Sequence, residues 1–100
     1  MPKLSADETH LWIVEDFLAE RPKLKHLRAR KRADTITLES GPIGDPITHA
    51  RLRRVTAQWW VFDLQERSGR WSEASMERTP LTDTLGVLAK VYAWVLKPRE

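Results

Sequence analysis

The sequence predicts a single α+β domain over residues 1–100, in which an antiparallel β-meander of four to five strands lies between an N-terminal and a C-terminal helix packed on one face of the sheet. β-branched and aromatic residues are densest in residues 47–64, around the pair Trp59-Trp60, and such residues suit a pleated, half-buried surface. Amphipathic segments at 5–20 and 82–96 each need an apolar surface to cover. A chain of 100 residues has room for one domain.

The N-terminal helix is expected over residues 5–20. Ser5 and Glu8 have the spacing of a capping box, in which the hydroxyl accepts from the backbone N–H of Glu8 and the carboxylate reaches back to the first residue. An apolar stripe at helical spacing follows, made of Leu11, Ile13, Val14, Phe17 and Leu18. Pro22 disfavours helical geometry at the residue before it, so the helix should end near Glu20.

The segment 24–32 admits two interpretations. Its two leucines face the core from a short turn, or the segment is a strand in which Leu27 and Ala29 alternate with arginines. We favour the strand, because residues 35–39 also alternate between apolar and polar side chains. The dipeptide Ala33-Asp34 is short enough to close a hairpin between the two segments.

Two strands at the centre of the sheet follow a loop at 41–46, which its glycines and prolines indicate. In residues 47–56, Ala50 and Leu52 face one way while Arg51 and Arg53 face the other. In residues 58–65 one face carries Trp60, Phe62 and Leu64, and the other carries Trp59, Val61 and Asp63. Both faces of this strand are partly apolar, so we expect a partner or other tryptophans to cover the second one.

The chain then returns and closes with a helix. Ser68-Gly69 indicates a tight turn into a short strand over residues 70–74 that carries Trp71. Thr82 or Asp83 is the expected N-cap of the last helix. Its apolar stripe is Leu85, Leu88, Tyr92 and Val95, and Pro98 should end it.

Charge is distributed unevenly along the chain. Residues 21–32 hold seven Lys or Arg and no acid, whereas residues 1–20 hold five acids and one Lys. The net charge is +3, and the remaining segments are close to balanced. One basic block therefore produces the high isoelectric point.

The order of these elements resembles a family of small bacterial proteins. The similarity rests on the apolar and aromatic positions of 46–50, 59–62, Trp71 and Leu85, and it covers residues 8–95. The resemblance implies a leading helix, a sheet with a tryptophan-bearing central strand and a closing helix. It implies no activity, because that family has none established. The loop at 41–46 is shorter here than in the family.

No arrangement of residues predicts catalysis, a cofactor or a metal. The histidines His10, His26 and His49 fall on three different predicted elements, without the helical spacing of a metal pair. The sequence offers no spacing from which a catalytic triad or a pair of catalytic carboxylates can be proposed, and its four glycines form no phosphate-binding loop. We therefore expect a protein that is not an enzyme and has no cofactor.

Composition bounds the location that we expect. The chain has no Cys, which is compatible with a reducing compartment. No apolar run approaches the ~18 residues of a membrane span, and the opening MPKLSADE lacks the apolar region of a secretion signal. We expect a cytoplasmic protein without a membrane partner.

Arginines supply one functional signal. The segments that carry them are expected side by side in the sheet and would present a basic surface made of Arg28, Arg30, Lys31, Arg32, Arg51, Arg53 and Arg54. Such a surface binds phosphates, and an exposed tryptophan beside it stacks on bases, which indicates a nucleic-acid-binding accessory protein. The alternative is a solvated face whose arginines pair with the acids of the first helix.

Tryptophans supply the other functional signal. Five in 100 residues are hard to bury, and Trp and Arg are enriched together at protein interfaces. The candidate interface consists of Trp59, Val61 and Trp71. We favour a binding module that acts through a protein interface over the nucleic-acid hypothesis. The simplest partner is a second copy of the chain, in a homodimer.

Overall fold

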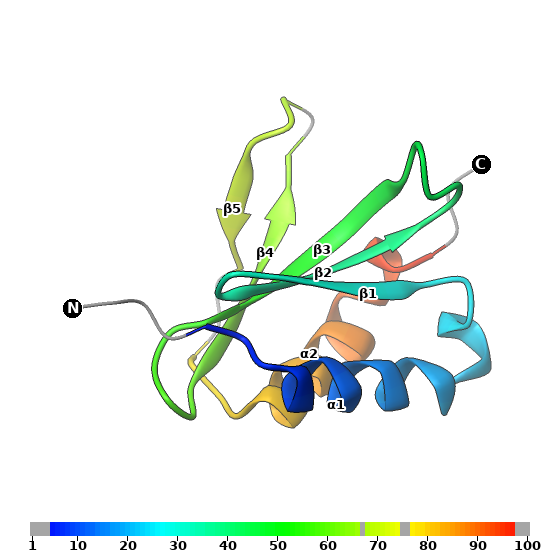
Figure 1. The fold of residues 1–100 in the computed structure, drawn as a ribbon. Coiled ribbons are helices and arrows are strands. Elements are labelled where there is room, and N and C mark those ends of the chain that lie inside the picture. Colours follow the sequence, from blue (N-terminus) through cyan, green and yellow to red (C-terminus); the bar gives the residue numbers. More distant parts are fainter. Residues whose placement is uncertain (1–4, 67, 75–76, 98–100) are drawn as a thin grey trace.

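A computed structural model describes residues 5–66, 68–74 and 77–97, and within them the chain forms one five-stranded antiparallel sheet with a helix at each end (Figure 1). The strands are β1 (Arg28–Arg32), β2 (Thr35–Ser40), β3 (Ile47–Arg54), β4 (Trp60–Gln65) and β5 (Trp71–Glu73). The helices are α1 (Glu8–Ala19) and α2 (Leu81–Val91), and the short 3₁₀ turns are η1 (Pro22–Leu24) and η2 (Ala93–Val95). Spatial order follows chain order from β1 to β5, which confirms the predicted meander.

Both helices lie on the same side of the sheet, as predicted (Figure 1). Trp60 and Phe62 of β4 are fully buried beneath them. The same inner face carries Ile36, Leu38, Ala50 and Leu52. The helices contribute Val14, Leu18, Leu85 and Leu88. One apolar core therefore occupies the space between the helices and the inner face.

Helix α1 begins later than predicted. Asp7 is its N-cap, and the capping box joins Asp7 to His10 rather than Ser5 to Glu8. The His10 backbone N–H donates to Asp7 Oδ1 at 3.2 Å, and the Asp7 N–H donates to His10 Nδ1 at 3.0 Å. The physical reason is that the preceding residues are tied to the sheet: the Ala6 N–H donates to the carbonyl of Ala33 at 2.8 Å. Ser5 is thereby held outside the helix.

The segment 24–32 combines both interpretations of its sequence. Leu24 lies buried in the turn η1, and Arg28–Arg32 is the strand β1, paired with β2 as predicted. Ala33-Asp34 closes the hairpin, with Ala33 at a positive φ of 52°. The Thr35 hydroxyl donates to the Arg32 carbonyl at 2.7 Å and fixes the turn.

Helix α2 begins and ends before the predicted positions. Its N-cap is Pro80, not Thr82 or Asp83, because Thr79 exchanges backbone hydrogen bonds with Trp60 and leads the chain directly from the sheet into the helix. The helix ends at Val91, and Val95 belongs to the separate turn η2. Pro98, the expected stop, lies outside the described residues.

Register changes once, between β2 and β3. Leu38 pairs with Ala50, whereas Glu39 pairs with Thr48, so His49 is the extra residue of a bulge. The bulge turns His49 toward the helix side, where its Nδ1 lies 2.9 Å from the Val95 carbonyl oxygen. A carbonyl only accepts, so Nδ1 carries the proton and donates.

Candidate functional site

The sheet face opposite the helices is called the outer face here, and no helix among the described residues covers it (Figure 1). Strand alternation and register place on it the side chains of Arg28, Arg30, Arg32, Thr35, Thr37, Glu39, Arg51, Arg53, Val61, Asp63, Trp71 and Glu73. Within these strands it therefore carries five arginines and three carboxylates. A bare sheet face with this many charges is the candidate site.

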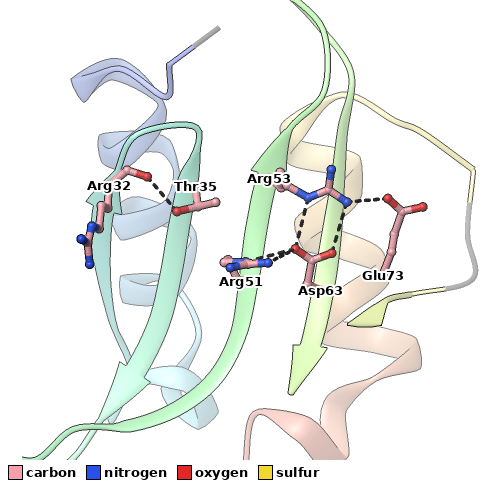
Figure 2. A network of polar contacts seen from close by, with 6 residues as sticks. All are labelled: Arg32, Thr35, Arg51, Arg53, Asp63 and Glu73. Carbon is pink, nitrogen blue, oxygen red and sulfur yellow. Dashed lines mark hydrogen bonds and ion pairs between the residues drawn. The ribbon is translucent and has the colours of Figure 1, made fainter. Parts of the chain in front are cut away.

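Asp63 organises the half of the outer face nearest β4 (Figure 2). Its Oδ2 accepts from Arg51 Nη2 at 2.9 Å and from Arg53 Nε at 3.2 Å. Arg53 Nη2 also reaches Asp63 Oδ1 at 3.3 Å and Glu73 Oε1 at 2.5 Å. Asp63 is only 2% exposed, so its charge is buried beneath two guanidinium groups. The hydrogen bonds to Asp63 raise the pKa of Arg53 above its ordinary value.

Glu39 organises the other half. Its carboxylate is buried, with Oε1 3.4 Å from Arg28 Nε and Oε2 3.8 Å from Arg30 Nη2. Arg28 is held further by the Gly41 carbonyl, which accepts from its Nη1 at 2.6 Å. Arg30 has the longer contact and is exposed. The charge of Glu39 is thus neutralised by β1 while Arg30 stays accessible.

The predicted basic surface is divided by the fold. β2 lies between β1 and β3, so the two arginine-bearing strands are not side by side as expected. Lys31 pairs with Ile36 and points to the helix side, where it is exposed at the sheet edge. Arg54 also lies on the helix side, with its guanidinium donating to the carbonyls of Ser5 and Ala57 at 2.8 and 2.7 Å.

Ion pairing on the outer face differs from the pairing that the sequence suggested. The described partners of Arg28, Arg30, Arg51 and Arg53 are the sheet carboxylates Glu39, Asp63 and Glu73, not the acids of α1. Sequence reasoning did not identify these carboxylates as partners. Asp63 is preceded by three buried residues of β4. A charged residue in such a buried run is the sequence signal for a buried ion pair, because charged side chains are rarely buried without a partner.

The tryptophans and Val61 occupy different environments. Val61 is 1% exposed and offers little area to a partner, whereas Trp59 is 38% exposed just before β4. Trp71 is half-buried, with the Arg51 guanidinium carbon 4.5 Å from its ring centroid in a cation–π contact. Trp12 and Trp94 are 58% and 64% exposed, and lie on α1 and η2 rather than on the outer face.

The histidines do not form a metal site among the described residues, where no group of three potential ligands gathers. The rings of His26 and His49 approach each other, with 5.9 Å between centroids, but each donates to a backbone carbonyl. His10 packs instead on the Trp60 ring, 5.0 Å away. Their roles are therefore tied to packing and to capping of backbone groups.

No described helix combines the length and the apolar character that crossing a membrane requires. Comparison of the chain with protein-family models, with curated proteins and with solved structures found no match.

Proposed function

We propose that the protein is a non-enzymatic binding module that associates with a second copy through the outer face. The observation that carries the proposal is the fixed arginine–carboxylate network around Asp63 on a sheet face that no described helix covers (Figures 1 and 2). Arg and Trp are enriched at protein interfaces, and the outer face carries both, with Arg51 placed over the Trp71 ring. Side chains ordered before association lose less conformational entropy when they bind.

Charge distribution supports a second copy as the partner. The β1 end of the outer face carries three arginines, whereas the β5 end carries the half-exposed Glu73. A two-fold axis along β3 would set β1 of one copy over β5 of the other and bring opposite charges together. The charged side chains of β1 disfavour edge-to-edge pairing, so face-to-face packing is the favoured mode.

Size-exclusion chromatography with light scattering tests the proposal. We expect the protein to have twice its 11.6 kDa chain mass, and Trp59→Glu to have the mass of one chain, because a charge at the border of the outer face opposes close packing. Trp12→Glu is the matched control and should remain a dimer, since Trp12 lies on α1. A single-chain mass for the unmodified protein at millimolar concentration rules the dimer out.

A second candidate function, nucleic-acid binding, is favoured by the cations of β1. Arg30, Lys31 and Arg32 are all exposed, and in the described chain Glu39 is the carboxylate nearest to Arg30. Binding through these side chains would weaken steeply with salt, with a log–log slope of ~−0.7 to −0.9 per phosphate. Fluorescence anisotropy with labelled single-stranded and duplex oligonucleotides at two salt concentrations separates the candidates. Arg30→Gln with Arg32→Gln should flatten that slope by about two units.

A cytoplasmic location is part of the proposal. The sequence contains no cysteine, which is compatible with this location because proteins in reducing compartments rarely form disulfides.

A further inference from the structure

A hollow of about 920 Å³ lies between the turn η1 and the end of α2, away from the outer face. Its apolar surface comes from Leu24, Ala89, Ala93 and Leu96. Leu24 and Leu96 are core residues, so the floor is part of the packed interior and does not depend on mobile side chains. Volumes of several hundred cubic ångströms are typical of sites for small organic ligands.

The charged groups that line this hollow are all cationic among the described residues. Arg21 and Lys23 come from the η1 wall, and Lys90 and Lys97 come from the α2–η2 wall. Lysine near a helix C-terminus is expected from the helix dipole alone, which accounts for Lys90. It does not account for two further cations on the opposite wall, which belongs to a different part of the chain.

A backbone carbonyl of the hollow is occupied by a histidine. His26 Nε2 lies 2.7 Å from the Leu96 carbonyl oxygen, and both residues line the hollow. This ring nitrogen donates, because a carbonyl only accepts. One oxygen that would repel an anion in the hollow therefore already accepts a hydrogen bond.

Arg21 is already held in place on its own wall. Its guanidinium carbon lies 3.6 Å from the centroid of the Phe17 ring, and its Nη1 donates to the Phe17 carbonyl at 3.2 Å. Glu20 lies 4.0 Å from that Nη1 and is largely exposed. The three lysines are exposed and make no described ion pair, so they are the groups available to a ligand.

We propose that this hollow binds a small anionic amphiphile, in which a carboxylate or a phosphate is joined to a saturated hydrocarbon chain. The chain would lie on Ala89 and Ala93, over the floor that Leu24 and Leu96 form, and the head would lie between Lys23 and Lys90. Burial of the hydrocarbon chain supplies most of the affinity, because it removes apolar surface from water. The lysines select an anion over an uncharged or cationic head.

Titration of ¹⁵N-labelled full-length protein tests this site. Decanoate and decyl phosphate, each below its micelle-forming concentration, should shift the backbone amides of residues 21–26 and 89–97. Decanol and decyltrimethylammonium, which share the chain but lack the negative head, should bind at least tenfold more weakly. The ratio between the two anions distinguishes a carboxylate from a phosphate ligand. Equal binding of decanol and decanoate, or shifts centred elsewhere, overturns the proposal.

Two variants of the hollow, each with a control elsewhere on the surface, locate the interaction. Lys23→Glu with Lys90→Glu should lower decanoate affinity by about tenfold, whereas Lys31→Glu, at the edge of β1 outside the hollow, should leave it unchanged. Ala93→Phe should block the chain without charge change, and Ala57→Phe, on an exposed loop, is its control. Circular dichroism confirms that each variant is folded. Binding to anionic phospholipid vesicles without binding of monomeric decanoate would replace the proposed ligand by a membrane surface.

Discussion

Asp63 is a buried carboxylate in a strand that otherwise contributes to the core, and neighbouring arginines stabilise its charge. Four hydrogen bonds from Arg51 and Arg53 satisfy its two oxygens. The alternation of the sequence predicted that both arginines lie on one face of their strand. The alternation could not predict their pairing with Asp63, because the register between two strands is set by turn geometry.

Replacing Asp63 by Ala should lower the free energy of unfolding by about 2 to 3 kcal/mol. Breaking a fully buried pair costs about 3 to 5 kcal/mol, and the value here is smaller because both guanidinium groups keep about 30% exposure and stay partly hydrated. Urea denaturation of the two proteins measures the difference. Glu73→Ala is the control and should cost ~0 to 1 kcal/mol, as an exposed pair does. Equal losses in both variants would mean that the burial of Asp63 contributes nothing.

At the scale of elements, helix starts were the least predictable feature. Ser5 and Glu8 had the spacing of a capping box, yet Asp7 and His10 form it. The deciding contact, from the Ala6 N–H to the Ala33 carbonyl, joins residues far apart in the chain and leaves no trace in local sequence. The hairpin at Ala33-Asp34, in contrast, was predictable, because the strands on both sides alternate and the turn is short.

The new capping box makes the start of α1 sensitive to pH. Burial lowers the pKa of His10 below 6.5, and this effect outweighs the nearby Asp7 charge, which acts in the opposite direction; the Arg54 charge adds to the lowering. The unfolded chain therefore binds the proton more readily than the folded one. The contribution of neutral His10 to stability is complete above about pH 6.5 and is lost as pH falls below it.

His10→Gln should remove this pH dependence. Gln keeps the capping acceptor and cannot be protonated. As pH falls from 7.5 to about 5, the unfolding free energy of the unmodified protein should therefore decrease more than that of the variant. Thermal or urea unfolding at a series of pH values measures it. Parallel pH profiles for the two proteins would contradict the assignment.

On the scale of the whole molecule, one core joins both helices to the sheet. The predicted faces of β3 and β4 were right because a period of two assigns each side chain once the apolar set is known. The ion pairs between the sheet carboxylates and the arginines, and the hollow at the end of α2, were not predictable. The ion pairs depend on the register between strands, and the hollow depends on η1 and η2, which only the folded chain brings together.

Trp60→Ala tests that single core and should lower the unfolding free energy by about 3 to 5 kcal/mol. Trp60 is fully buried, contacts the His10 ring and pairs with Thr79, so its loss leaves a cavity next to α1 and to the segment that leads into α2. Chemical denaturation followed by circular dichroism measures the effect without relying on tryptophan emission. Trp12→Ala, on the exposed side of α1, should cost less than 1 kcal/mol. A loss below 1 kcal/mol for Trp60→Ala would mean that the core does not depend on this ring.

The identity of strand order and chain order has a consequence for folding during synthesis. Each strand can pair with its predecessor as soon as it leaves the ribosome, because closing a short hairpin takes only microseconds, far less than adding a residue. Helix α2, which covers β4, follows all five strands in the chain. The apolar side of β4 around Trp60 and Phe62 therefore lacks the cover of α2 until residues 81–91 have been made, and this is the interval in which a chaperone would act on the chain.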